Sequence, residues 1–256
     1  MSDIAPARPS STVVVARAGE PEPELFMVRR HAESSFGAAY AFPGGVVDED
    51  DAVVHEFCTG LGTRHANSRL GVKAHGLDLY SAAIRELFEE SGVLLAMSEN
   101  LDEDLSIVRD ALNDGSESWA DFVARNRLEL QCDRLHYFSH WLTPPTLPRR
   151  YSTRFFLAEL PQGQTATHCG GELIDSRWTT AHDMLEAGRV GDVELHFPTI
   201  KTLESIARHK SLAALLEWAR SCVEWGVTSM VPKIIERDGE QVIVLPGEKD
   251  YPGAKS

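Results

Sequence analysis

The chain has 256 residues, of which 43% are hydrophobic and 25% charged, a composition that lets a globular protein bury a core without disulfides or a structural metal. Acidic side chains outnumber basic ones by 39 to 25, giving a formal net charge of -14, and this argues against nucleic-acid or anionic-membrane partners, because both need a basic field. The four cysteines form no CxxC pair, and no apolar run approaches the ~20 residues of a membrane span. We therefore expect free thiols and a cytoplasmic protein.

The beginning of the chain predicts a short lead and an opening hairpin. Residues 1–11 (MSDIAPARPSS) are expected to be a disordered lead before a single domain over 12–256. Two β-rich runs, Thr12–Ala16 and Glu24–Arg30, flank a polar turn and predict the hairpin. Ala41–Gly45 (AFPGG) indicates a tight loop, because glycines adopt unusual backbone angles. The region after it, to about residue 80, shows no clean period and is interpreted as an insertion with some helix.

The clearest helix is predicted at Ser81–Ser91, where apolar residues between Ala83 and Phe88 recur at three- and four-residue spacing before Gly92 ends the pattern. Further helices are predicted at Leu101–Asn113, Ser118–Arg127, Ala181–Ala187, Thr199–His209 and Ser211–Cys222. Strands are predicted at His136–Leu142, Tyr151–Leu160, Glu172–Thr179 and Gln241–Leu245. The irregular alternation of these elements favours an α/β fold with a mixed sheet.

Three carboxylates stand out on the predicted helix. Glu86, Glu89 and Glu90 are spaced i, i+3 and i+4, so their side chains project from one face. Hard divalent cations such as Mg²⁺ or Mn²⁺ prefer oxygen ligands and would offset the repulsion between the three charges. The alternative is a solvent-exposed acidic helix face without a ligand.

The residues around this trio resemble the Nudix box, which consists of a glycine, a glutamate six positions on, a spacer, and REUxEExGU with U aliphatic. The matching positions are Gly45, Arg85, Glu86, Leu87, Glu89, Glu90, Gly92 and Val93. Asp51 stands where the box has its glutamate, and Glu49 is the alternative for that position. The spacer between Asp51 and Arg85 is much longer than is usual in the family.

Further segments are similar to a long-spacer branch of the Nudix hydrolases, which includes peroxisomal coenzyme A diphosphatases of animals and related bacterial hydrolases. They are WLTPPTLPRRYSTRFF at 141–156, Trp178, and FPTIKTLESIA at 197–207, within a resemblance that covers roughly Val13–Arg208. The resemblance implies a Nudix α/β/α sandwich with a mixed sheet and an enlarged insertion before the catalytic helix. Insertions are expected at about 52–80 and 101–130, forming a lid or specificity wall.

The resemblance also implies a metal-dependent hydrolase that cleaves the diphosphate of a small nucleoside-diphosphate-linked molecule, with coenzyme A or acyl-coenzyme A as the first candidate substrate. ADP-ribose, a dinucleotide or a nucleotide sugar is the alternative substrate, and a non-catalytic Nudix-fold binding module is the alternative of another class. A homodimer is a further option, because many members of the family are dimers.

The implied site residues fall into three groups. Mg²⁺ or Mn²⁺ would be held by the Gly45 carbonyl and by the carboxylates of Glu86, Glu89, Glu90 and Glu172. Glu89 and Glu90 would be catalytic, and Arg85 would orient a carboxylate through a charge-assisted pair. Substrate contacts are expected from Arg30, Arg149 and Arg150, which could meet phosphates, and from Tyr151, which could stack on a base.

Overall fold

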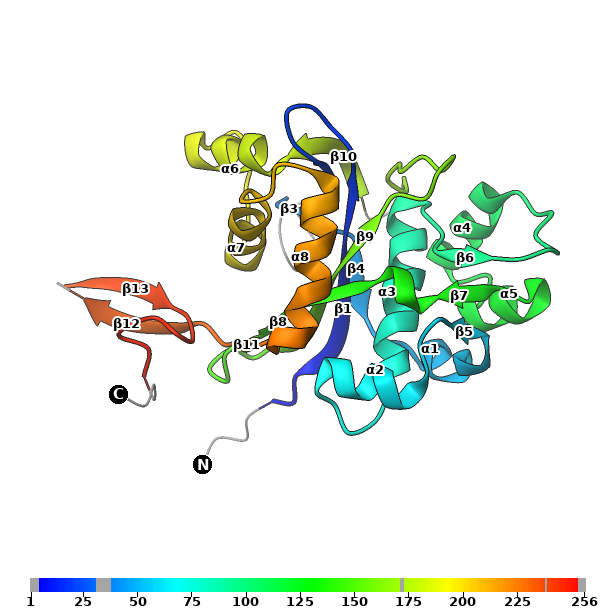
Figure 1. Ribbon diagram of the computed structural model, residues 1–256, viewed down its shortest axis with the longest axis horizontal. Coiled ribbons are helices and arrows are strands. Elements are labelled where there is room, and N and C mark those ends of the chain that lie inside the picture. Colours follow the sequence, from blue (N-terminus) through cyan, green and yellow to red (C-terminus); the bar gives the residue numbers. More distant parts are fainter. Residues whose placement is uncertain (1–4, 31–37, 171–172, 238, 253–256) are drawn as a thin grey trace.

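The computed structural model describes residues 5–30, 38–170, 173–237 and 239–252. A mixed sheet in the order β10-β2-β1-β9-β8-β11 forms the centre, with β3 beside β2 and β4 beside β1 (Figure 1). β1 runs parallel to β9 and antiparallel to β2 and β4. The strands are β1 (Arg8–Arg17), β2 (Glu24–Arg30), β3 (Tyr40–Ala41), β4 (Gly44–Val46), β8 (His136–Leu142), β9 (Tyr151–Glu159), β10 (Leu173–Thr180) and β11 (Ser229–Met230).

Helices cover both faces of this sheet (Figure 1). One face carries α1 (Glu49–Val53), α2 (Thr63–Leu70), α3 (Gly76–Ser91), α4 (Leu105–Asp114) and α5 (Trp119–Asn126). The other face carries α6 (Ala181–Val190), α7 (Phe197–Ile206) and α8 (Leu212–Trp225). A small sheet of β5 (Cys58–Thr59), β7 (Glu129–Gln131) and β6 (Ala96–Met97) lies beside α4 and α5 (Figure 1). The expected α/β sandwich with a mixed sheet is thus confirmed.

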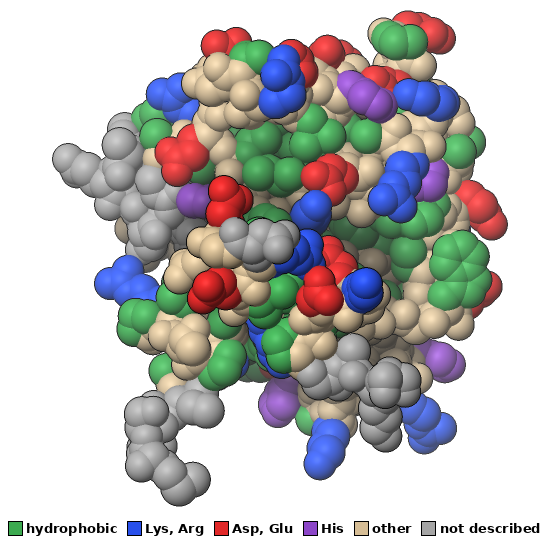
Figure 2. All heavy atoms as spheres, turned by 90° about the vertical axis from the view of Figure 1, so that its left-hand side faces the viewer, with side chains coloured by type: hydrophobic (Ala, Val, Ile, Leu, Met, Phe, Trp, Pro, Cys, Tyr) green, Lys and Arg blue, Asp and Glu red, His purple; other side chains and the backbone are tan. Residues whose placement is uncertain are grey.

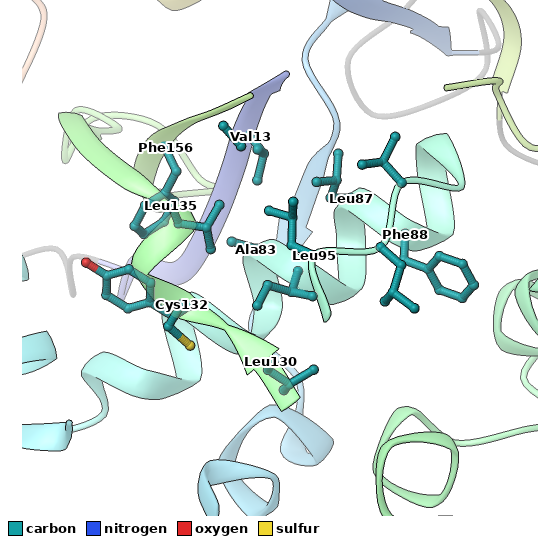
Figure 3. Close-up of a cluster of buried hydrophobic side chains, with 14 of the residues drawn as sticks. Val13, Ala83, Leu87, Phe88, Leu95, Leu130, Cys132, Leu135 and Phe156 are labelled. Atoms are coloured by element: carbon teal, nitrogen blue, oxygen red, sulfur yellow. The ribbon is translucent and has the colours of Figure 1, made fainter. Parts of the chain in front are cut away.

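Two apolar cores result because successive side chains of a strand point to opposite faces. In β1, Val13 and Val15 belong to the core under α3, whereas Val14 belongs to the core under α6, α7 and α8. Figure 3 shows part of the first core, in which Leu87 of α3 and Phe156 of β9 are fully buried in one cluster. Each such large apolar side chain contributes ~1.5–3 kcal/mol by leaving water. The packing therefore fixes α3 against the sheet and positions its acidic residues.

A C-terminal hairpin extends from the body of the molecule (Figure 1). It consists of β12 (Lys233–Arg237) and β13 (Glu240–Val244), and it follows β11 at the edge of the central sheet. Seen from the side of this hairpin, acidic and basic side chains are interspersed among apolar ones (Figure 2). Over the part of this face that the structure describes, charge of one sign is therefore not gathered into a single field.

The main differences from the predicted elements lie near the chain start and in the insertion. β1 begins at Arg8, so the expected disordered lead is wrong for residues 8–11, which pair with β9, and of which residues 10 and 11 also pair with β4. The predicted loop at Ala41–Gly45 is instead β3 and β4 joined through Pro43. Gly44 has φ 158°, and a Cβ there would overlap the backbone of Ser11, so β4 can pair with β1 only because this residue is glycine.

Helix α3, which carries the three glutamates, begins at Gly76, five residues before the predicted start. Its first turn continues the apolar face through Leu77 and Tyr80, and the Gly76 amide is bound by the Asn67 side chain at the end of α2. The 52–80 insertion therefore contains α2, β5, a 3-10 turn at His55–Phe57 and this first turn of α3. All four cysteines are free, and no helix in the described ranges has the length and apolarity to cross a membrane.

Candidate active site

Arg85 lies at the centre of the acidic cluster on α3 and is only 7% exposed. Its Nη2 donates to Asp51 Oδ2 at 3.0 Å and to the Val46 carbonyl at 2.9 Å, and its Nε donates to Asp51 Oδ1 at 3.3 Å. The planar guanidinium matches a carboxylate in this two-pronged geometry. Arg85 thereby joins α3 to β4 and α1, which are far apart from α3 in the sequence.

Asp51 is fully buried and anchors Arg85. Ser81 Oγ donates to Asp51 Oδ1 at 2.9 Å, and the amide of Asp48 donates to Oδ2 at 2.9 Å as part of the capping box of α1. Burial raises the pKa of the Asp51 carboxyl, and the contacts with Arg85 oppose that rise. Glu49, the alternative for this position, is exposed. The structure thus places Asp51, rather than Glu49, against Arg85 of the motif.

The remaining guanidinium nitrogen of Arg85 faces the acidic trio. Nη1 donates to Glu86 Oε1 at 2.9 Å and to Glu89 Oε2 at 3.0 Å. Burial disfavours the charged guanidinium, but Glu86 and Asp51 outweigh that effect and raise the pKa of Arg85. The expectation that Arg85 orients a helix carboxylate agrees with these contacts, which fix the rotamers of Glu86 and Glu89 toward β4.

The two glycines of β4 complete the cluster. The Gly44 amide donates to Glu90 Oε2 at 2.9 Å, and a Cβ on Gly45 would overlap the Glu86 carboxylate. Glycine at position 45 therefore lets the Glu86 carboxylate lie directly against the backbone of β4 in this conformation. Burial, reinforced by the charge of Glu86 and opposed by Arg85, raises the pKa of Glu89 to about 7.

The donor set of this cluster fits a hard divalent cation. Carboxylates of Asp51, Glu86, Glu89 and Glu90 lie near the guanidinium of Arg85, and the guanidinium of Arg109 lies near Glu90. Negative charge is therefore in excess, and oxygen donors suit Mg²⁺ or Mn²⁺. In the side-chain conformations present, Glu86 and Glu89 are turned toward Arg85. No three His, Cys, Asp or Glu side chains among the described residues converge as a ready set of metal ligands.

A chain of buried hydrogen bonds supports the cluster from behind. Trp119 Nε1 of α5 donates to Ser81 Oγ at 3.1 Å, and Ser81 in turn donates to Asp51. Trp119 is buried in the core. Neither Trp119 nor Ser81 belongs to the motif, and no local sequence pattern points to their role, because the contact joins residues 38 positions apart.

Two of the predicted site residues fall outside what the structure describes: Glu172 as a whole and the side chain of Arg30. Arg149, Arg150 and Tyr151 line a cavity of about 320 Å³ together with Arg8. Arg150 is engaged there, since its Nε donates to the Thr143 carbonyl at 3.1 Å and its Nη1 to the Ala5 carbonyl at 2.7 Å.

This cavity is separate from the acidic cluster. Gly45 pairs with Ser11, and Tyr151 pairs with Arg8, so the two pairing points are three positions apart along β1, or about 10 Å of strand. Ser11 Oγ donates to the Leu79 carbonyl of α3 at 2.6 Å. Because side chains alternate along a strand, Arg8 lies on the opposite face. The structure therefore does not bring Arg149, Arg150 and Tyr151 together with the three glutamates.

Comparisons with known proteins find similarity to Nudix hydrolases in a family model, in sequence relatives and in a solved structure. A family model described as NUDT19 Nudix domain matches residues 75–206, which include α3. A Caenorhabditis elegans protein named putative nudix hydrolase 7 is 26% identical over 237 residues, covering 89% of this chain and 69% of the relative. The acyl-coenzyme A diphosphatase NUDT19 of Xenopus laevis is 25% identical over 271 residues, covering 90% and 71%. A crystal structure of a NUDIX hydrolase from Alicyclobacillus acidocaldarius superposes with a TM-score of 0.71 at 26% identity, covering 84% of this chain and 97% of the other.

Proposed function

Because the chain belongs to the NUDT19 Nudix domain family and is a hydrolase of pyrophosphate bonds, we propose that it hydrolyses the diphosphate of coenzyme A or acyl-coenzyme A at the acidic cluster of α3. The observation that carries the proposal is the set of ion pairs that Arg85 forms with Asp51, Glu86 and Glu89. These ion pairs lie beside the glycines of β4. The substrate class is supported by the Xenopus relative, which is named an acyl-coenzyme A diphosphatase.

The metal ion belongs to the same proposal. Glu86, Glu89 and Glu90 would hold it with the carbonyl of Gly45, and when bound it would neutralise the diphosphate and make a water molecule more acidic. Intact carboxylates at all three positions favour this reading over a non-catalytic binding module. Release of Glu86 and Glu89 from Arg85 would free the oxygens that now face the guanidinium.

The chain's own residues have distinct tasks in this scheme. In the metal-free cluster the pKa of Glu89 is about 7, and a bound divalent cation would lower it. Glu89 would then be ionised at neutral pH and able to hold the metal or accept a proton from the attacking water. Arg85 holds the glutamates in place and supplies positive charge near the diphosphate, while Asp51 prevents the guanidinium from turning fully toward them. Glycine at position 45 leaves the carbonyl and the substrate access to the cluster.

Product analysis tests the proposal. Purified protein is incubated with coenzyme A and Mg²⁺ or Mn²⁺, and products are identified by mass spectrometry. Water addition across the diphosphate should give 3′,5′-ADP and 4′-phosphopantetheine. Glu89→Gln should abolish most of this activity, whereas the matched control Glu49→Gln, at an exposed carboxylate of α1, should retain it. Intact coenzyme A after prolonged incubation with either metal would refute the proposed substrate.

A further inference from the structure

Helix α4, from the second insertion, docks on the C-terminal end of α3. The last carbonyls of a helix lack partners within the helix. The Glu89 carbonyl receives Arg109 Nε at 2.8 Å and Asn113 Nδ2 at 3.1 Å, both from α4. Asn113 Nδ2 also donates to the Arg109 carbonyl at 2.9 Å. Two side chains one turn apart thus bind the backbone of a proposed metal ligand.

Arg109 also binds a third segment. Its Nη2 donates to the Thr167 carbonyl at 2.8 Å, and the Thr167 amide donates to the Ser91 carbonyl at the end of α3 at 2.9 Å. One guanidinium therefore connects α4, the last turn of α3 and the loop that follows β9. The end of α3 cannot move without breaking these bonds.

The charge of Arg109 is unusual for its position. The residue is 8% exposed, burial lowers the pKa of its guanidinium while the charges of Asp110 and Glu90 oppose that shift, and its hydrogen bonds go to backbone carbonyls. Burying a cation in this way is costly, although the negative end of the α3 dipole offsets part of the cost. Because α3 is already capped by the Gly92 amide, which binds the Phe88 carbonyl at 2.8 Å, termination of the helix alone does not require Arg109.

We propose that Arg109 is a positioning residue for the metal site: by fixing the Glu89 carbonyl, it sets the direction in which the Glu89 and Glu90 side chains leave the last turn of α3. The inference rests on the proposed function, since it takes these carboxylates as metal ligands. A cation nearby would by itself repel a metal ion. The hydrogen bonds of the guanidinium go to backbone carbonyls, so the role that we assign to Arg109 is geometric: it fixes the backbone from which the carboxylates project.

The test is the dissociation constant of Mn²⁺ alone, measured by titration calorimetry on folded protein well below its unfolding temperature. Arg109→Met should raise it about tenfold, equivalent to about 1.4 kcal/mol. Arg109→Lys should lie between wild type and Arg109→Met, because lysine keeps the charge but cannot hold both carbonyls. The control Arg125→Met loses a surface arginine that pairs with Glu103 and Glu117 and should leave Mn²⁺ affinity unchanged.

Kinetics and a second variant complete the experiment. Arg109→Met should lower kcat more than it changes KM, since Arg109 binds backbone carbonyls and is assigned to positioning the metal ligands, not to binding substrate. If that variant does not fold, Asn113→Ala, which removes the other donor to the same carbonyl, should still raise the Mn²⁺ dissociation constant. Equal or tighter Mn²⁺ binding by the variants would overturn the role of Arg109. Wild-type protein that binds no Mn²⁺ would instead refute the metal site itself, and failure to hydrolyse coenzyme A with normal metal binding would refute only the substrate.

Discussion

Replacing Asp51 by asparagine tests the anchor of Arg85. The substitution removes the charge that meets Nε and Nη2 of Arg85 inside the protein. Removing one partner of a buried ion pair typically costs 3–5 kcal/mol. Arg85 keeps Glu86, Glu89 and the Val46 carbonyl as partners, so we expect the lower end, a loss of about 3 kcal/mol in the free energy of unfolding.

The activity should fall as well. Without the Asp51 carboxylate, the guanidinium can turn fully toward Glu86 and Glu89 and compete with a metal ion for them, so kcat should drop at least ~10-fold, or ~1.4 kcal/mol. Urea unfolding and steady-state hydrolysis measure the two effects. Asp50→Asn is the matched control, since Asp50 Oδ2 only accepts from the Ala120 amide. Equal, small effects of Asp51→Asn and Asp50→Asn would refute the reasoning.

Three further predictions follow from the site and its surroundings. Glu89→Gln should cut turnover at saturating metal by at least ~10²-fold, or ~2.7 kcal/mol, and should leave folding intact because one of several like charges is removed. The control Glu49→Gln should keep near wild-type turnover. Near wild-type turnover of Glu89→Gln would contradict the assignment of Glu89 to the site. Burial lowers the pKa of His140 from 6.5 to about 4, so its contribution to stability is present above pH 6.5 and is lost as the pH falls toward 4, by up to about 3 kcal/mol. His140→Gln should reduce the fall in unfolding free energy over this range by up to about 3 kcal/mol. Part of the fall should remain, because burial lowers the pKa of His136 to about 4 as well; an unchanged pH dependence would be inconsistent with this. Arg149→Ala should leave kcat for coenzyme A within about twofold, because its cavity lies about 10 Å of strand from the cluster, and a large drop in kcat would show that the cavity takes part in the reaction.

The arrangement of the predicted site residues could be derived from the sequence where those residues are close together in the chain. Glu86, Glu89 and Glu90 share a helix, so their common face follows from helical geometry alone, and the structure places them there. The long strands β1 and β9 were also predictable, because each is a clear β-rich run. Their parallel pairing was not, because it joins residues more than 140 positions apart and no local sequence pattern indicates which strands pair.

The rest depended on long-range contacts or on elements too short for a period. Asp51 and Arg85 are 34 positions apart, so sequence spacing alone could not decide whether Asp51 or Glu49 occupies the box position. The structure distinguishes them, because Asp51 is buried against Arg85 and Glu49 is exposed. In the insertion, α1 has five residues and β5 has two, which is less than the length needed to show either period. No sequence pattern points to the role of Arg109, because it binds the backbone carbonyl of Glu89, and every residue has such a carbonyl whatever its side chain.

The central claim is that the acidic cluster of α3 hydrolyses a coenzyme A diphosphate. The most direct measurement is a competition assay in which coenzyme A, acetyl-coenzyme A, ADP-ribose and NADH are present at equal concentration with Mg²⁺ or Mn²⁺, so that relative rates report the ratio of kcat/KM. The account predicts that coenzyme A or its acyl form is consumed first, giving 4′-phosphopantetheine or its acyl derivative with 3′,5′-ADP. Preferential consumption of ADP-ribose or NADH would contradict the claim.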